Sequence, residues 1–475
     1  MRQKTLLLPA VGLLALGALL GWSSGSMGQA AKPAAANCLA YKTNTKIATD
    51  LLVPGMKLPC APAVGISGAS KDPLDNLQHG FDLYSWLIFT SLNTPADGKT
   101  SILNGSGPTV WQNYKDLSDV MLENGQEPKA WDAPGNVPGI RGEVPKECLK
   151  LAKPGMMVIH IEEETFDQPF KSGPLVDQNG NYGLFDILMN KEMFDYIRTN
   201  KLYNIQGQRD FAQAINFPLG TNGSPTAPVA LGAVMVKVSW KVLAANDDPK
   251  EFHTIQGLVY DDRHGPATCA VAPLGLVGFH VAHKTDHAPQ WVWTTFEHFR
   301  NVPTQDDVDA HKLLDHYNFY NPKCDVAQCP VNRTPPRPWD PRTEPFPGGF
   351  HSQITRVIPQ SADALNMDKD ARAVLSGTVW KNYMLVSTQW PTNFASKTDP
   401  TGAPAPTYLP NATLETFSQG EIPLASSSCI ACHNNATTHG LPATTSDFTY
   451  ILEKAHDLVA NATPSQTPNS RRKRP

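Results

Sequence analysis

Beyond its N-terminal region, the sequence has no apolar run of the roughly 20 residues that cross a bilayer. It also lacks an excess of basic side chains, since 40 Lys and Arg are balanced by 44 Asp and Glu. This balance is not typical of proteins that bind nucleic acid. No unit of about 20–50 residues repeats, so a solenoid or a propeller is not indicated. We therefore expect a globular protein with no integral span after the N-terminal region and no nucleic-acid partner.

The one long apolar run, Leu6–Trp22, follows Arg2 and Lys4 and precedes small residues that end at Ala30. This order is typical of a secretory signal peptide, and we expect cleavage after Ala30. A permanent membrane anchor is the alternative, but the run is short and is interrupted by Gly and Pro. No twin arginine precedes the run, which favours the general export route. We expect residues 1–30 to be removed and the mature protein to be periplasmic or secreted, in a bacterium.

Eight cysteines in an exported chain indicate disulfide bonds. Two of them, Cys429 and Cys432, belong to a motif described below. The other six allow many pairings, and the sequence alone does not choose among them. Proximity along the chain favours two pairs and leaves a third: Cys38–Cys60, Cys324–Cys329 and Cys148–Cys269.

Residues 426–435 read SSSCIACHNN, in which two cysteines stand three apart and His433 follows the second. In such a CxxCH motif each thiol can add across one vinyl group of a haem, and the histidine becomes an axial ligand of the iron. A thioredoxin-type thiol pair would need a strand before it and a long helix after it. A zinc site would need further ligands, and no second CxxC or HxxxH lies near. The motif predicts one covalent haem c, bound by Cys429, Cys432 and His433.

The sequence does not identify the sixth ligand of the iron. Small c-type cytochromes usually take a methionine tens of residues after the motif, but this chain has no methionine after Met384. The candidates outside the histidine-rich segment are Met384 and Met367 upstream and His439 and His456 downstream. The position is otherwise open to a small molecule.

Four histidines gather in the segment 274–303, which reads LGLVGFHVAHKTDHAPQWVWTTFEHFRNVP. Two apolar runs, 274–283 and 290–299, are joined by a short polar loop, which predicts a β-hairpin. Because side chains alternate along a strand, His280 and His283 should point to opposite faces. His283 and His298 are expected to lie near the loop and to face each other. The histidines and the neighbouring acid are His280, His283, His287, His298 and Glu297.

Three interpretations of this segment remain open. One histidine contacts the haem, as the sixth ligand or as an acid or base in the pocket. Alternatively, the segment forms a separate metal site of His/His/Glu type. Finally, the histidines are hydrogen-bonded residues of the core and its rim.

Periodicity predicts the remaining elements. Apolar residues at helical spacing predict a helix over 77–92. Residues 233–243 alternate as a strand, with 253–260 as its expected partner. A second strand pair is predicted from 354–357 and 384–386. These elements predict an α+β fold, with a large β-rich body, short helices and a mainly helical haem-binding segment at the C-terminus.

We expect four segments along the chain. The signal peptide over 1–30 precedes a β-rich body with an N-terminal helix over 31–375. A haem-binding c-type cytochrome segment follows over 376–465. A basic disordered tail over 466–475 ends the chain.

Several stretches together resemble a group of secreted bacterial "cytochrome c family" proteins with a single C-terminal CxxCH motif. They are Tyr84-Ser85-Trp86, Ser91-Leu92-Asn93, Pro174-Leu175-Val176-Asp177-Gln178-Asn179-Gly180, the run LGLVGFHVAHKT with PQWVWTTFEHF, Thr388-Gln389-Trp390-Pro391 and SSSCIACHNNAT. The resemblance covers most of the chain after residue 30. It implies single-haem binding through Cys429, Cys432 and His433 and a role in electron transfer, but no substrate. Thr94-Pro95 departs from the Trp-Pro expected there.

The leading prediction is an exported monohaem c-type cytochrome that carries single electrons to or from a redox partner protein or a small molecule. The body is larger than an electron carrier needs, which leaves two alternatives open. One is a haem oxidoreductase with an open sixth position, suited to peroxide or oxygen chemistry. The other is a β-rich binding module in which the haem has a sensing or structural role.

Overall fold

The computed structural model describes residues 37–40, 50–51, 53–63, 73–161, 167–225, 228–262, 265–325, 327–334, 352–393, 404–418 and 427–459. The expected signal peptide, 1–30, and the expected basic tail, 466–475, lie outside these ranges. The described residues all belong to one compact unit, residues 36–475. Within them, no helix combines the length and the apolar character that a bilayer crossing requires.

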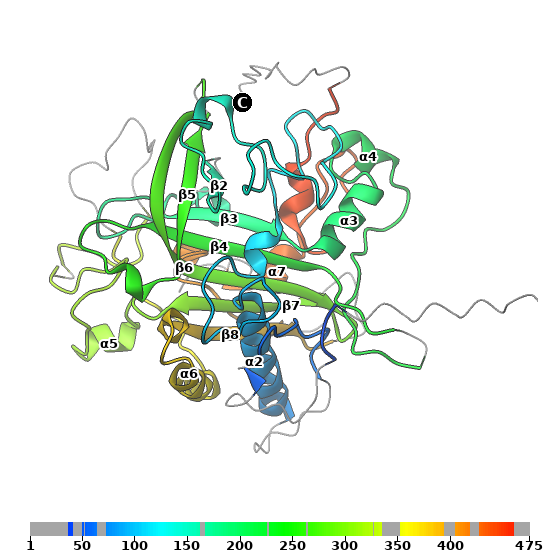
Figure 1. Ribbon diagram of the computed structural model, residues 1–475. Coiled ribbons are helices and arrows are strands. Elements are labelled where there is room, and N and C mark those ends of the chain that lie inside the picture. The colour runs from blue at the N-terminus through cyan, green and yellow to red at the C-terminus, as the bar shows by residue number, and fades with distance from the viewer. Residues whose placement is uncertain are drawn as a thin grey trace, which may run out of the picture. The chain divides into compact units, whose positions relative to one another are not determined.

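A large, mainly antiparallel sheet is the centre of the fold (Figure 1). Seven strands follow the order β1-β3-β4-β6-β7-β8-β9, β5 pairs with the first half of β6, and β2 pairs with β5 in parallel. The strands are β1 Lys115–Asp116, β2 Met157–His160, β3 Leu184–Met189, β4 Val234–Val242, β5 Thr254–Asp261, β6 Thr268–Thr285, β7 Ala288–His298, β8 Tyr383–Pro391 and β9 Pro404–Ala405. With short helices around it, this sheet confirms the predicted α+β class.

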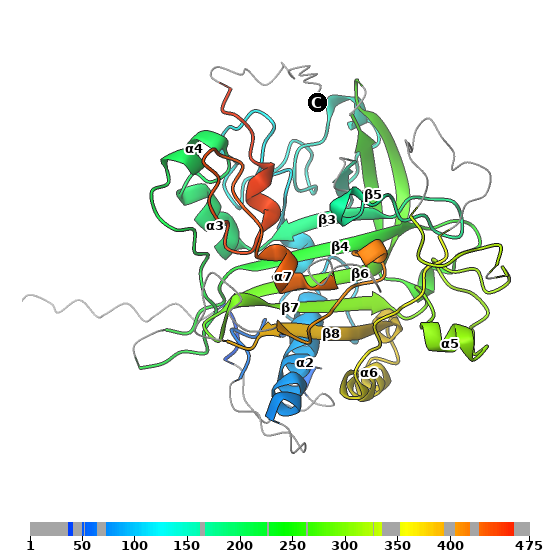
Figure 2. The ribbon, with the colours of Figure 1, turned by 180° about the vertical axis from the view of Figure 1, so that it is seen from behind.

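Short helices lie around the sheet. The α-helices are α2 Pro73–Leu92, α3 Lys191–Thr199, α4 Ile205–Asp210, α5 Gln305–Asp309, α6 Ala362–Val374 and α7 Cys429–His433. The 3-10 helices are η1 Trp111–Asn113, η2 Lys146–Cys148, η4 Pro169–Lys171, η5 Pro249–Glu251, η7 Val379–Asn382, η8 Thr416–Ser418 and η10 Tyr450–Lys454. Figures 1 and 2 show α2 on one face of the sheet and α7 with the rest of the C-terminal segment on the other.

Side-chain alternation along β7 separates the two faces. Thr294 forms a 2.7 Å hydrogen bond with Ser85 of α2. Its neighbour Trp293 points the other way, and its ring centroid lies 4.2 Å from that of His433 in α7. Both faces are buried, because every residue of β7 is buried. The sheet therefore separates an α2 core from a second core beneath the C-terminal segment.

Several predicted elements are confirmed. The helix over 77–92 is part of α2, the strand over 233–243 is β4, and the hairpin is β6 with β7. Beyond residue 376, β8 is paired with β7 and belongs to the same sheet.

Two predicted strand pairings are wrong. The expected partner of β4, residues 253–260, forms β5, which pairs with β6 and β2. The reason is the length of β6, 18 residues, which lets its first half bind β5 and its second half bind β4. Residues 354–357 form no strand, and Arg356 makes only an isolated bridge with Thr304. The strand expected over 384–386 lies in β8, and its partner is β7.

The predicted disulfide pairing is confirmed. Bonds join Cys38 to Cys60, Cys148 to Cys269 and Cys324 to Cys329. The two cysteines of the CxxCH motif remain free thiols. The cysteines thus fall into three structural pairs and one pair available for other chemistry.

The bond between Cys148 and Cys269 should contribute more to stability than the bond between Cys324 and Cys329. It closes a separation of 121 residues rather than 5, and the entropy removed from the unfolded chain grows with loop length. We expect the Cys148→Ala/Cys269→Ala variant to lose about 5 kcal/mol and the Cys324→Ala/Cys329→Ala variant about 2 kcal/mol. Urea unfolding followed by Trp fluorescence measures both, and equal losses would contradict the loop-length argument.

Candidate functional site

The CxxCH motif forms α7, a single helical turn fixed to β8 (Figure 2). Ser428 caps its N-terminus, because its hydroxyl oxygen accepts the N–H of Ala431 at 3.4 Å. The Oε1 atom of Gln389 accepts the N–H of Ile430 at 2.8 Å and the hydroxyl of Ser428 at 3.2 Å. These contacts satisfy N–H groups that a helix N-terminus leaves without partners. Since Ile430 is also fully buried, the backbone of the motif is held against the sheet.

The imidazole of His433 is oriented by one hydrogen bond and two aromatic rings. Its Nδ1–H donates to the carbonyl of Phe448 at 2.9 Å. The ring centroids of Trp293 and Tyr450 lie 4.2 and 5.1 Å from its own. Burial lowers the pKa of His433 to about 4, although the bond to the Phe448 carbonyl acts in the opposite direction. In the described part of the chain Nε2 makes no hydrogen bond, so a neutral ring presents a lone pair there.

The two free thiols of α7 are partly buried. The Sγ atom of Cys432 is 3.9 Å from the hydroxyl oxygen of Tyr450, and that of Cys429 is 3.6 Å from the carbonyl oxygen of Leu409. Burial raises the pKa of both thiols. Thioredoxin-type pairs instead carry a thiol of lowered pKa at the start of a long helix, whereas α7 ends at His433. The geometry therefore does not favour a redox thiol pair.

The carbonyl that binds His433 belongs to a strained and firmly anchored loop. Asp447 and Phe448 both have left-handed backbone angles, with φ of 56° and 65°. The carboxylate of Asp447 forms an ion pair with Lys284, and both side chains are at most 3% exposed. The indole N–H of Trp291, itself at φ 67°, donates to the carbonyl of Asp447 at 3.0 Å. Such strain persists only where surrounding contacts enforce it.

A second set of ionisable groups, the Lys237–Glu415–His280 cluster, lies on the same face of the sheet. Lys237 of β4 is directly opposite His280 of β6. The Nε2 atom of His280 lies 2.9 and 3.0 Å from the two carboxylate oxygens of Glu415. The N–H of Asn411 donates to the same carboxylate at 3.1 Å. Burial alone would raise the pKa of Glu415, but His280, Lys237 and this N–H outweigh it and lower that pKa.

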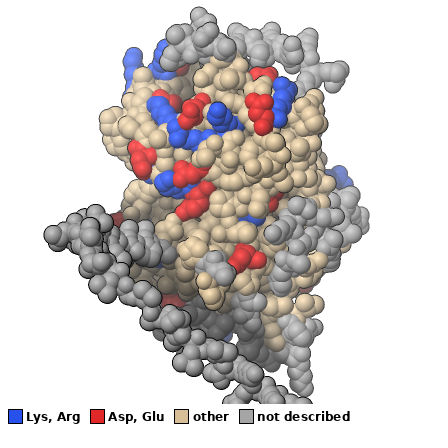
Figure 3. All heavy atoms as spheres, turned by 90° about the vertical axis from the view of Figure 1, so that its right-hand side faces the viewer, with Lys and Arg blue, Asp and Glu red and all other residues tan. Residues whose placement is uncertain are grey.

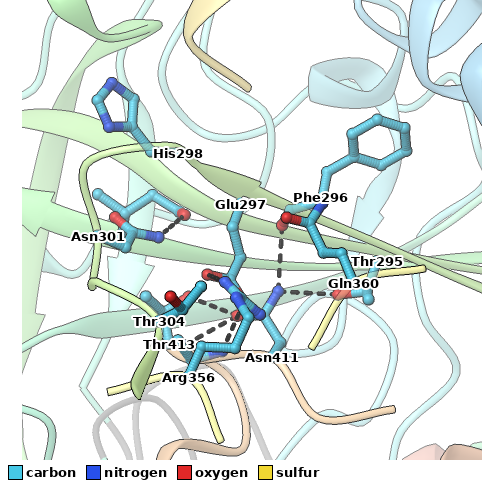
Figure 4. A network of polar contacts seen from close by, with 12 residues as sticks. Thr295, Phe296, Glu297, His298, Asn301, Thr304, Arg356, Gln360, Asn411 and Thr413 are labelled. Carbon is cyan, nitrogen blue, oxygen red and sulfur yellow. Dashed lines mark hydrogen bonds and ion pairs between the residues drawn. The ribbon is translucent and has the colours of Figure 1, made fainter. Parts of the chain in front are cut away.

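The segment 409–418, which carries Glu415, is bound directly to β7 (Figure 4). The side-chain amide of Asn411 donates to the hydroxyl oxygen of Thr295 at 2.8 Å. One carboxylate oxygen of Glu297 accepts the N–H of Ala412 at 2.6 Å, and the other accepts Nη2 of Arg356 at 2.6 Å. The Glu297–Arg356 pair is at most 2% exposed. Glu297 therefore has a structural role in holding this segment.

The close approach of segment 409–418 requires the glycine at position 278. A Cβ atom there would lie 2.2 Å from the hydroxyl oxygen of Thr413 and 2.4 Å from that of Ser239. Both distances are far below van der Waals contact, so only hydrogen fits at Gly278.

The structure places His283 away from α7. Its ring lies on the α2 face, where the hydroxyl of Tyr84 donates to Nδ1 and Nε2–H donates to the carbonyl of Leu231. Both ring nitrogens are thereby occupied. Burial lowers the pKa of His283 to about 4. His283 is a neutral core histidine in this arrangement.

The expectation that His283 and His298 face each other near the loop is wrong. The register pairs His283 with Val292 and His298 with Tyr383, so the two histidines lie at opposite ends of the hairpin. His298 donates through Nε2 to the carbonyl of Glu251 at 3.0 Å, and its ring points away from the network in Figure 4. A hairpin metal site of His/His/Glu type is therefore not supported, and no group of three potential ligands gathers among the described residues.

Of the other sixth-ligand candidates, the two methionines lie elsewhere. Met384 pairs with Glu297 and stands five positions before Gln389, about 16 Å along β8 from the residue that holds α7. Met367 belongs to α6 and packs in the α2 core. His439 is bound through Nδ1 to the carbonyl of Glu453 at 2.6 Å, and His456 is exposed. His280 is the candidate that shares the face of α7.

Sequence reasoning gave Lys237 and Glu415 no role in this site, and it missed the hydrogen bonds that Gln389 and Phe448 make. Alternation within 233–243 places Lys237 on the face opposite the apolar side chains. It gave no sign that this face is covered, because the covering segment lies nearly 180 residues further along the chain. Gln389 and Phe448 act through a side-chain amide and a backbone carbonyl, for which the sequence carries no distinct signal.

No family model, no curated protein and no solved structure matches this chain.

Breaking the buried pair of Lys284 and Asp447 should destabilise the protein strongly. In a Lys284→Met variant the carboxylate would remain buried without its partner, and we expect a loss of about 3–5 kcal/mol in the free energy of unfolding. Adding Asp447→Asn to this variant should restore most of the lost free energy of unfolding, since Asn tolerates left-handed backbone angles. Lys191→Met is the matched control, because Lys191 and Asp195 are about half exposed and should lose less than about 1 kcal/mol. Urea unfolding gives all three values, and equal losses in the two single variants would contradict the expectation.

Proposed function

We propose that this chain is an exported monohaem c-type cytochrome that carries single electrons. Its haem would be attached to Cys429 and Cys432 and ligated by Nε2 of His433. The observation that carries the proposal is the hydrogen bond between Nδ1 of His433, in the CxxCH motif, and the Phe448 carbonyl, which only accepts and so places the ring proton on Nδ1. Metal-ligating histidines usually donate their other ring N–H to a carbonyl or a carboxylate, which fixes the ring and leaves the ligating nitrogen free.

The residues present fit this group. Both motif thiols are free. In attachment, each sulfur bonds to one vinyl carbon and its hydrogen goes to the other, so the addition needs no oxidant. The surroundings are suitably apolar, because Ile430, Trp293, Phe448 and Ile451 belong to one buried cluster. We assign residues 427–459, with α7 and η10, to the haem-binding segment predicted over 376–465.

When bound, the haem supplies one-electron chemistry between ferric and ferrous iron. The chain's part is to bind, orient and shield. His433 would bind the iron through Nε2, and the Phe448 carbonyl fixes the orientation of its ring. Trp293 and Tyr450 pack against this half-buried ring. Apolar cover and hydrogen bonding to the axial ligand are the means by which a protein sets the potential of such a site.

The three disulfides support a location in an oxidising compartment, periplasmic or extracellular. We propose a redox partner protein or a small molecule as the source or destination of the electron. On the face shown in Figure 3, basic and acidic side chains are interleaved, and neither sign forms a broad field. That face therefore does not select a strongly charged partner.

A haem oxidoreductase with an open sixth position is the second candidate. It is favoured by the placement of His283, His298 and Met384, all of which the fold holds away from α7. Carbon monoxide added to the reduced holoprotein separates the two candidates. A shift of the haem absorbance favours an open position, and an unchanged spectrum favours the electron carrier.

Replacing the motif thiols should abolish covalent haem binding. We expect Cys429→Ser/Cys432→Ser to give no band on a haem-stained denaturing gel and the mass of bare polypeptide, because no thioether can form. His433→Ala should keep the stained band but change the visible spectrum, since the thioethers remain and the axial nitrogen is lost. Cys324→Ser/Cys329→Ser is the control and should stain as the parent does. A parent protein without covalent haem, made with an active haem-attachment apparatus, would end the proposal.

A further inference from the structure

We infer that His280, held by Glu415, is a redox-linked proton acceptor next to the haem. The inference rests on the proposed function and extends it. It makes electron uptake at this site proton-coupled. Three features carry it: the face on which His280 lies, the single ring nitrogen that Glu415 occupies, and the charged groups around it.

The sheet register places His280 near His433. His280 pairs with Thr295 of β7, and Trp293 stands two positions along the same strand on the same face. Such diagonal neighbours lie about 7–8 Å apart. Trp293 in turn packs on His433, with ring centroids 4.2 Å apart. His280 therefore belongs to the surface on which the CxxCH motif rests, unlike His283 and His298.

The hydrogen bonds of His280 leave one nitrogen for a proton. Its Nε2–H faces both carboxylate oxygens of Glu415 at 2.9 and 3.0 Å. Within the described ranges Nδ1 makes no hydrogen bond. A proton that binds at Nδ1 creates an imidazolium in contact with a carboxylate, which is a favourable pair at a partly buried site. The His280 side chain is 15% exposed, so protons can exchange with solvent.

Ionisable groups from several elements surround His280. Glu415 is ionised, since the surrounding groups lower its pKa. Lys237 faces His280 across the strands and opposes the added proton, although Glu415 partly offsets it. Lys454 of η10 also interacts with Lys237 and contributes to lowering its pKa. From α7, Cys429, Cys432 and His433 face the cluster; the first two are consumed in thioethers and the third in iron ligation.

Electron and proton are then coupled through space. If an external one-electron donor reduced the bound haem, the charge at the site would fall by one unit. One proton from water at Nδ1 of His280 compensates that charge, and reoxidation releases both. The interaction is stronger in a partly buried site than in water, and the coupling is reciprocal: reduction raises proton affinity, and protonation raises the midpoint potential. As pH rises, His280 loses its proton and the midpoint potential falls.

The test is a spectroelectrochemical titration of the holoprotein from about pH 5 to about pH 8, the interval in which histidine ordinarily titrates. We expect the parent potential to fall with rising pH. His280→Gln should make the midpoint potential independent of pH. Its side-chain amide can still donate to Glu415. In Glu415→Gln, the pH range over which the midpoint potential changes should move to lower pH, because the imidazolium no longer has a carboxylate beside it. His439→Gln is the matched control: this histidine lies in the same segment, bound to the Glu453 carbonyl, and its loss should leave the slope unchanged.

A parent potential independent of pH, or an unchanged slope in His280→Gln, would overturn the inference. If His280→Gln fails to fold, proton uptake on reduction of the parent in weakly buffered solution decides the matter, and no uptake between about pH 5 and about pH 8 refutes the inference. Haem staining of each sample separates the two proposals. Absence of covalent haem defeats the proposed function, whereas stained protein with a flat profile defeats only the role of His280.

Discussion

A buried ion pair, Lys284 with Asp447, fixes the loop on which the geometry of the site depends. Lys284 stands near the end of β6, and Asp447 lies beside the residue whose carbonyl binds His433. The carboxylate also accepts the N–H of Phe217 at 2.7 Å. Two consecutive residues with left-handed backbone angles would not hold that shape without such contacts. The orientation of one imidazole is thus determined by charges that do not touch it.

The two faces of the sheet carry different kinds of side chain. The α2 face packs aromatic side chains, as in the stacking of Phe89 on Phe296 with centroids 4.1 Å apart. On that side His283 has both ring nitrogens occupied. The opposite face carries Lys237 and His280, with Glu415 above them. Groups of this kind are stable there because a separate segment of chain supplies their partners.

Local patterns predicted a substantial part of this architecture. Helical spacing identified α2, and alternation identified β4. Cysteine proximity identified two disulfides and left the third pair as the remainder. What failed depended on register. The position of His298 follows from where β6 and β7 begin to pair, and the partner of β5 follows from the unexpected length of β6. The periodicity of a single strand determines neither the register of β6 with β7 nor the length of β6.

Only the part of the site that is formed by consecutive residues could be predicted from the sequence. The CxxCH motif occupies five consecutive residues, so its spacing is visible in the sequence. The oxygen that orients His433 belongs to Phe448, and the groups nearby come from β4, β6 and segment 409–418. None of these contributions has a fixed distance in sequence from the motif. Packing brings them together, and packing cannot be deduced from composition.

The contacts that fix the loop beside His433 join residues far apart in the sequence, and this separation affects how the protein folds. The bond from the Phe217 N–H to Asp447 spans 230 residues, and the Lys284–Asp447 pair spans 163. Closing such large loops costs chain entropy before any contact compensates for it, and contacts of this range slow folding. We therefore expect the surroundings of His433 to assemble after the sheet, so that a spectroscopic probe of that ring would report the completion of folding rather than its beginning.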